Sequence, residues 1–298
     1  MGISRVYGGL LARARQKGVE FGHVATIGRQ SLCIPPEDLA ELGKRLGRTG
    51  LDWPRISSAG YAEPFLKEVL GANHVTSFDY SDYQGVDITH DFNQPLAANL
   101  HQTFDSLVDG GTMEHIFDVK CVLANYMSMV KCGGSIFVHT PANNLMGHGF
   151  YQFCPELFYR VFSAENGFSV EEVCLTESPF PSIEISRRQR GYLARDPESM
   201  GKRIRFVNDR PLMIFVHARR TEVKPLFQSA PAQSDLALVW AAHETEKTEG
   251  EPGMKQEGPE LTARPFRYIS WWEEVRRWHV LRRKKSFRNK RFFQPLDV

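Results

Sequence analysis

The sequence predicts an α/β protein with a Rossmann-like, doubly wound fold: a mostly parallel, seven-stranded sheet with helices on both faces. Two observations support this class. Short apolar runs alternate with helical patterns along residues 21–220. Most of these runs are continuously apolar, and they do not alternate between apolar and polar residues. Continuous runs are typical of parallel strands that are buried on both faces.

Seven apolar runs are expected to form the strands. They are His23–Ile27, Val75–Phe78, Val86–Thr89, Phe104–Val108, Ser135–His139, Val170–Leu175 and Leu212–Val216. A long polar segment, with no clean helical pattern, separates the last two runs. This spacing favours an antiparallel arrangement at one edge of the sheet.

Helical patterns lie between several of these runs. The expected helices cover Pro35–Leu46, Ala62–Leu70, the segment after Asp118 and the segment from Pro155. Asp118 is expected to be an N-cap, because its carboxylate can accept a hydrogen bond from the first helical turn. Residues 47–60 are rich in Gly, Arg, Pro and Ser and are expected to form an irregular loop.

Composition divides the chain into four parts. Residues 1–20 are expected to be an N-terminal extension that holds a short helix, and residues 21–220 the Rossmann-like domain. Residues 221–262 are expected to be a polar, largely disordered linker, because the end of this segment has too few apolar residues to pack. Residues 263–298 are expected to be a basic, tryptophan-rich C-terminal tail.

Several classes of protein are disfavoured by composition. The five cysteines are scattered and never spaced C-x-x-C, so neither a disulfide framework nor a zinc site is expected. The histidines form no ligand-spaced pair, and the expectation for metals is therefore none. No apolar stretch reaches the length of about 18 residues of a membrane span. We expect no signal peptide and a cytoplasmic protein.

Ligands of open parallel sheets bind at the carboxyl ends of the strands, where the strand order reverses. The residues that end the expected strands are therefore candidates for a binding site. They include Gly28-Arg29-Gln30, Asp79-Tyr80-Ser81, Asp91, and Asp109-Gly110-Gly111. A carboxylate after the second strand is expected to accept hydrogen bonds from a ribose diol. The alternative is that Asp and Gly only favour turns at these positions.

At these residues the chain resembles the class I S-adenosylmethionine-dependent methyltransferases. The segments Phe104–Ile116 and Lys131–Val138 look like the family's fourth-strand motif and its turn into the fifth strand. The resemblance covers roughly residues 21–220. Residues 143–168 are similar to a bacterial subgroup whose methyl acceptor is undefined. The resemblance implies S-adenosylmethionine as cofactor, bound by Gly28, Arg29, Gln30, Asp79, Ser81, Asp91, Asp109, Gly110 and Gly111.

The first loop departs from the family pattern, because the usual run of glycines is reduced to Gly28-Arg29-Gln30. Backbone approach to the methionine part of the cofactor normally depends on those glycines. One interpretation is a methyltransferase that binds its cofactor differently, with Arg29 on the cofactor carboxylate. The alternative is a non-catalytic scaffold or binding module that has lost the cofactor. A nicotinamide-dependent oxidoreductase is disfavoured, because G-x-G-x-x-G is absent.

Glu114 and His115 are the candidate catalytic residues. Either side chain is placed to act as a general base if the acceptor is a hydroxyl or an amine. The alternative is a role in capping and surface solvation. His90, His139 and His148 are also candidates for the pocket, but structural roles are favoured for them.

Two basic segments indicate which kinds of molecule the protein binds. One lies between the last two strands and favours an anionic acceptor, a small molecule or a glycan; its cations are Arg187, Arg188, Arg190, Arg195, Lys202, Arg203 and Arg205. The other has aromatic and apolar residues at helical spacing: Tyr268, Trp271, Trp272, Val275 and Trp278. It suits an anionic membrane, at the inner face, or an acidic partner. The alternatives are a solvated loop and tryptophans packed on the domain. No specific nucleic-acid binding is expected.

Overall fold

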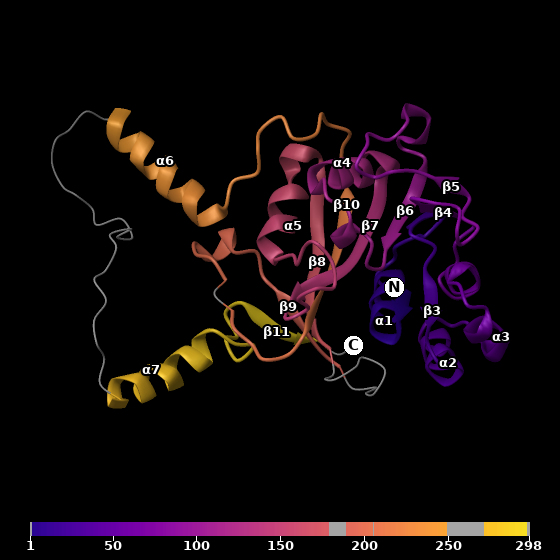
Figure 1. The fold of residues 1–298 in the computed structure, drawn as a ribbon, viewed down its shortest axis with the longest axis horizontal. Coiled ribbons are helices and arrows are strands. Elements are labelled where there is room, and N and C mark those ends of the chain that lie inside the picture. The colour runs from indigo at the N-terminus through magenta and orange to yellow at the C-terminus, as the bar shows by residue number, and fades with distance from the viewer. Residues whose placement is uncertain (1, 179–188, 205, 249–270, 297–298) are drawn as a thin grey trace.

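A computed structural model describes residues 2–178, 189–204, 206–248 and 271–296 (Figure 1). Its centre is a nine-stranded sheet. In spatial order the strands are β11 (Phe293–Leu296), β9 (Arg190–Ala194), β8 (Phe168–Glu177), β10 (Leu212–Arg220), β7 (Val130–Asn143), β6 (Phe104–Asp109), β2 (His23–Ile27), β4 (His74–Asp79) and β5 (Ile88–Thr89).

Five of these strands form a parallel core in the order β5-β4-β2-β6-β7. Numbered along the chain, this is the 3-2-1-4-5 order of doubly wound sheets. The chain moves outward from β2 through β4 to β5 and then returns to the other side of β2 with β6. The strand order therefore reverses between β2 and β6, which is where ligands of such sheets bind.

The rest of the sheet differs from the prediction. β10 is antiparallel to both β7 and β8 and lies between them, so the antiparallel strand is inside the sheet and not at its edge. Two further strands, β9 and β11, extend the sheet beyond β8. The prediction of seven strands missed both, because these strands are short and carry a charged residue or a proline, as Arg190 in β9 and Pro295 in the edge strand β11.

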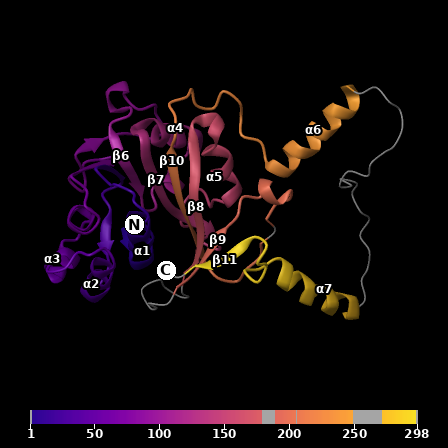
Figure 2. The ribbon, with the colours of Figure 1, turned by 180° about the vertical axis from the view of Figure 1, so that it is seen from behind.

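Helices cover both faces of the sheet, as predicted (Figures 1 and 2). On one face pack α1 (Arg5–Gln16), α2 (Pro36–Arg45), α3 (Trp53–Ser58) and the π-helical η1 (Phe65–Val69); on the other pack α4 (Val119–Met129) and α5 (Pro155–Val161). Short 3₁₀ helices are η2 (Ala98–Leu100), η3 (Met113–His115), η4 (Ala164–Asn166) and η6 (Glu198–Met200). Within β2, Val24 packs in one core and its neighbour Ala25 in the other, because successive side chains of a strand point to opposite faces.

The N-terminal residues belong to the domain and are not an extension. β1 (Gly2–Ser4) pairs in parallel with β3 (Ser31–Cys33), and α1 buries Tyr7 and Leu11 completely. The expected loop at 47–60 contains α3, which Asp52 caps by accepting a hydrogen bond from the Arg55 N–H at 3.1 Å. Both differences arise because tertiary packing provides the apolar partner that a short helix lacks alone.

The C-terminal part also differs from an extended linker and tail. α6 (Ser234–Thr248) occupies part of the expected linker, and α7 (Trp271–Lys284) follows; both helices point away from the sheet (Figures 1 and 2). Residues 249–270, with Tyr268, lie outside the described part of the chain. Phe292 and Phe293 are buried in the core beside β9. The described residues after α7 therefore return to the domain, where β11 pairs with β9. Among the described residues, no helix is long and apolar enough to cross a membrane.

His217 is buried within β10, on the face that α1 covers. Its ring stacks on Phe137 at 4.5 Å between centroids, and its Nε2 lies 3.1 Å from the Ser135 hydroxyl. Burial lowers the pKa of His217 to about 4, with a smaller contribution from the charge of Lys17. The folded chain therefore keeps this imidazole neutral at pH values where an unfolded histidine is charged.

We predict that the free energy of unfolding falls as the pH drops from about 6.5 to 4, because only the unfolded state takes up this proton. His217→Gln keeps a hydrogen-bonding group toward Ser135 but removes the titration. The variant should therefore lose about 2 kcal/mol less stability than the parent between pH 7 and pH 4.5. Urea unfolding at the two pH values measures this difference, and equal losses would contradict the prediction.

Candidate functional site

Gly28 and Asp79 lie side by side at the carboxyl ends of β2 and β4. Gly28 has a φ of +74°, a conformation that favours glycine. Its N–H donates to the Phe78 carbonyl at 2.7 Å, which joins the ends of the two strands. Asp79 Oδ2 lies 3.9 Å from the position that a Cβ on Gly28 would occupy. The structure thus brings together the predicted glycine and the predicted ribose-binding carboxylate.

The Asp79 side chain is half-buried. Its Oδ1 accepts a hydrogen bond from the Tyr80 N–H at 2.6 Å. The residues that follow are exposed: Tyr80, Ser81 and Tyr83. Asp79 is therefore placed where an incoming diol can donate to it, beneath an exposed loop that carries two tyrosines.

The space between the β2 and β6 loops is partly filled by two side chains. The Thr112 hydroxyl donates to the Ile27 carbonyl at 2.7 Å, and the Gln30 amide donates to the same carbonyl at 2.5 Å. Gln30 is only 3% exposed and packs directly on Gly110, where a Cβ would overlap its Oε1. Gln30 and Gly110 therefore join the two loops to each other, and Gln30 does not reach the surface of the crevice.

Arg29 builds one wall of the site. Its guanidinium donates to Glu63 at 2.8 Å and to the Gln84 carbonyl at 2.6 Å, and it lies 4.0 Å above the Tyr61 ring. These contacts connect the first loop to the loop after β4. The expected contact between Arg29 and a cofactor carboxylate is not supported, because Glu63 already neutralises this cation.

Asp109 points into the protein and not into the crevice. Its carboxylate accepts hydrogen bonds from the backbone N–H groups of Gly111, Thr112 and Met113 and from the Tyr126 hydroxyl, at 2.7–3.1 Å. The side chain is completely buried, and burial raises the pKa of Asp109 to about 6. Asp109 therefore shapes the turn after β6 and has no exposed surface for a cofactor.

Asp91 lies on the loop after β5 and closes a local turn. Its Oδ1 accepts hydrogen bonds from the Asn93 N–H at 2.9 Å and from the Asn93 side-chain amide at 2.8 Å. These bonds lower the pKa of Asp91. The expected role of Asp91 in cofactor binding remains a prediction.

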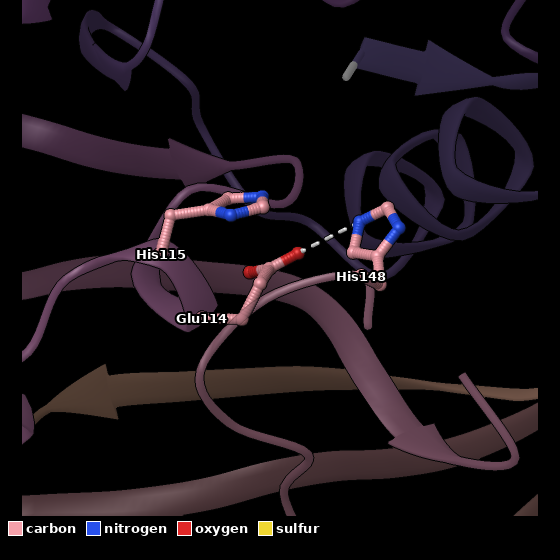
Figure 3. A group of neighbouring side chains, drawn as sticks. All are labelled: Glu114, His115 and His148. Carbon is pink, nitrogen blue, oxygen red and sulfur yellow. Dashed lines mark ion pairs between the residues drawn. The ribbon is translucent and has the colours of Figure 1, made fainter. Parts of the chain in front are cut away.

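Glu114, His115 and His148 form a compact polar cluster (Figure 3). Glu114 and His115 belong to η3, and His148 comes from the loop after β7. Glu114 is completely buried, with Oε2 accepting from the Thr140 hydroxyl at 2.8 Å and Oε1 3.6 Å from His148 Nε2. Burial raises the pKa of Glu114 to about 8, and burial together with His148 lowers the pKa of His115.

The loop after β7 packs closely on η3 because Gly149 has no side chain. A Cβ on Gly149 would lie 2.8 Å from the Glu114 carbonyl oxygen. The same carbonyl accepts hydrogen bonds from the N–H groups of Phe150 at 2.8 Å and Tyr151 at 3.3 Å. The backbone of Glu114 thus fixes the loop that carries His148.

The structure assigns different roles to the other two candidate histidines. His139 is buried and stacks on Tyr7 at 4.8 Å, and burial lowers its pKa to about 4. His90 packs edge-on against Phe92. Only His148 joins the catalytic candidates. β7 separates His148 from His115 in sequence and returns it in space, so the three side chains form a group that the sequence spacing did not indicate.

Exposed apolar side chains surround this cluster. Phe117 and Phe150 are 72% and 69% exposed and contact each other edge to face at 6.2 Å, and Met146 is 96% exposed. Exposed apolar groups at one site are typical of a binding surface. We call Phe117 and Phe150 the aromatic rim.

The basic segment between the last two predicted strands begins far from the β2 and β6 loops. Three strands (β8, β10 and β7) separate β9, which begins with Arg190, from β6, a distance of about 19 Å at the usual strand spacing. Arg203 is paired with Asp235 at 2.6 Å. Arg187, Arg188 and Arg205 lie outside the described residues. β9 and Arg203 therefore lie away from the β2 and β6 loops, whereas the end of the segment contacts the loop after β7, where the Asn144 amide donates to the carbonyls of Asn208 and Arg210 at 3.0 and 2.9 Å.

A cavity of about 400 Å³ opens at the opposite ends of the strands, among Lys17, Asp105, Gly133 and Arg219. It lies at the amino ends of the parallel strands. Ligands of such sheets bind at the carboxyl ends, so the candidate site is the one beside Gly28 and Glu114.

Comparisons with known proteins find structural likeness only. No family model and no curated protein matches the chain. A SAM-dependent methyltransferase from Thermotoga maritima is 13% identical, with 73% of this chain and 90% of that one covered and a TM-score of 0.39. The 1,6-didemethyltoxoflavin-N1-methyltransferase of Burkholderia thailandensis, with bound S-adenosylhomocysteine, is 11% identical, with 72% and 77% covered and a TM-score of 0.38.

A trans-methyltransferase, CalH, in complex with SAH is also similar, at 11% identity, with 72% of this chain and 55% of that one covered and a TM-score of 0.36. Likeness at this level does not identify a family. The function is therefore inferred from the residues of this chain.

We predict that Gly149→Ala destabilises the protein by about 1–3 kcal/mol, because the added Cβ has to displace backbone. Gly9→Ala is the matched control: a Cβ at this position in α1 meets nothing within 4 Å. It should stabilise the protein by about 0.5–1 kcal/mol through helix propensity. Urea unfolding measures both. A neutral effect of Gly149→Ala would show that this loop is not held against Glu114.

Proposed function

We propose that this chain binds S-adenosylmethionine at the ends of β2 and β4 and transfers its methyl group to a small-molecule acceptor. The observation that supports the proposal most directly is the position of Asp79. Its carboxylate stands at the tip of the second core strand, beside the positive-φ backbone of Gly28. A carboxylate at that strand end accepts hydrogen bonds from the two hydroxyls of a ribose.

When bound, S-adenosylmethionine supplies a methyl group made electrophilic by the positive sulfur. The acceptor atom forms a bond to the methyl carbon while the carbon–sulfur bond breaks and its electron pair stays on sulfur. Such an in-line displacement gains most of its acceleration from positioning. Asp79 would hold the ribose, beside the positive-φ backbone of Gly28.

The acceptor side of the proposed site is the cluster of Glu114, His115 and His148 with the aromatic rim. Thr112 connects the two sides, because its hydroxyl bonds to the end of β2 and it lies two residues before Glu114. An acceptor hydroxyl or amine must also lose a proton. Glu114 and His115 are the nearest candidate acceptors of that proton in sequence and space, and His115 is the exposed one.

A second candidate function has its own support. Gln30 and Thr112 occupy part of the crevice at the switch point, where close backbone approach would otherwise accommodate the cofactor. This observation favours a scaffold with the same fold and no cofactor. A nicotinamide-dependent oxidoreductase has less support, because only Gly28 of a G-x-G-x-x-G pattern follows β2.

Isothermal titration with S-adenosylhomocysteine tests the proposal. We expect micromolar binding by the parent chain. Asp79→Asn should weaken binding about 10- to 100-fold, because a hydrogen bond to a charged acceptor is worth about 1.5–3 kcal/mol. Asp82→Asn, an exposed aspartate in the same loop, is the control and should bind like the parent.

The two candidate functions give different results. A scaffold without cofactor would show no heat of binding at millimolar S-adenosylhomocysteine. Binding that is equally strong in Asp79→Asn would contradict the assignment of the ribose to Asp79.

A further inference from the structure

A buried carboxylate oxygen lacks a hydrogen-bond partner in the acceptor-side cluster. Glu114 is completely buried, and the Thr140 hydroxyl occupies only its Oε2. Oε1 accepts no hydrogen bond within the described part of the chain. Burying a carboxylate is costly unless it is paired or coordinates a metal. This oxygen points toward His148, and the ion pair between them, at 3.6 Å, is longer than a hydrogen bond (Figure 3).

The ligand atoms of the cluster are close enough to share one ion. One nitrogen of His115, one nitrogen of His148 and one oxygen of Glu114 all lie within 4.8 Å of one another. Two ligands of a tetrahedral ion bound at about 2.0–2.1 Å are about 3.3 Å apart. Glu114 Oε1 and His148 Nε2 are 3.6 Å apart, close to that value. His115 is exposed, so its side chain is free to rotate toward the other two ligands.

The backbone holds the cluster in place before any ion binds. The three N–H groups that donate to Asp109 fix the turn that leads into Glu114 and His115. The Glu114 carbonyl accepts hydrogen bonds from the loop that carries His148. Thr140 orients the carboxylate, as outer-shell partners of metal ligands commonly do. The backbone of all three ligand residues is therefore held by hydrogen bonds, and the Glu114 carboxylate is oriented by Thr140.

We propose that Glu114, His115 and His148 bind a divalent transition-metal ion, with zinc as the first candidate. Two imidazoles and one carboxylate form the ligand set of catalytic zinc sites and of non-haem iron(II) sites. Calcium and magnesium prefer sets composed of oxygen. Three protein ligands leave a coordination position open, and the exposed histidines place that position at the surface beside the aromatic rim.

This inference deepens the proposed function and rests on it only for the role of the ion. With the ion bound, Glu114 and His115 would be ligands and no longer proton acceptors, and an acceptor hydroxyl at the open position would release its proton to solvent more readily. The resulting oxygen would then form the bond to the methyl carbon. Metal binding itself needs no S-adenosylmethionine, so the two proposals fail separately.

The test is a metal titration of the full chain after removal of the purification tag and treatment with EDTA. We expect one equivalent of Zn²⁺ per chain after dialysis, measured by elemental analysis, with a micromolar or tighter Kd. Co²⁺ should give the visible absorption of a four- or five-coordinate nitrogen and oxygen site. His115→Ala and His148→Ala should each weaken Zn²⁺ binding at least tenfold. Thr140→Val should weaken it about tenfold, although it removes no ligand.

His101→Ala is the matched control. His101 is exposed, and its ring lies near the Leu96 carbonyl, outside the cluster. This variant should bind Zn²⁺ as the parent does. Three results would overturn the proposal: no retained zinc, binding unchanged in both ligand variants, or a cobalt–thiolate charge-transfer band that assigns the ion to cysteine. Because every variant is assayed by circular dichroism first, a loss of fold is not mistaken for a loss of ligand.

Discussion

The buried carboxylate of Asp109 is the interaction on which the candidate site depends. It accepts three backbone N–H groups from the turn after β6 and the hydroxyl of Tyr126. The Asp109 carbonyl accepts a further bond from Tyr7, at 3.0 Å. Helices on both faces thereby converge on one strand end. An unpaired carboxylate at that depth would be strongly destabilising, so the turn has little freedom to adopt another shape.

The shape of this turn has opposite consequences on its two sides. Toward β2 it brings Thr112 and Gly110 against Ile27 and Gln30, which fills part of the crevice at the switch point. Toward β7 it presents Glu114 and His115 to the loop that carries His148. Asp79 and Gly28 lie beside it and are half-buried, and the Thr112 hydroxyl stands 2.8 Å from the position that a Cβ on Gly28 would occupy. The same backbone constraint thus narrows the predicted cofactor site and assembles the polar cluster.

Much of the fold was predictable because the relevant signals are local. The His23–Ile27 run gave a strand with the bounds that the structure has, and Asp118 caps α4 through the Cys121 N–H at 2.9 Å. The position of Asp79 after the second strand followed from the same pattern. The burial of Asp109 did not follow, because an aspartate that ends a strand has the same local sequence whether it points inward or outward. The position of β10 did not follow either. The local sequence does not indicate whether this strand pairs with β7, with β8 or with both.

The sequence by itself determined the alternation of strands and helices, the parallel core and the residues that stand at its strand ends, because each depends on apolar period and turn chemistry within a few residues. Only the tertiary structure decided which of those residues face a ligand. Gln30 and Asp109 turned inward to satisfy buried backbone groups, Arg29 paired with Glu63, and His148 joined Glu114 across β7. Such pairings join residues that are far apart in the chain. They therefore stabilise the protein only once the sheet has formed.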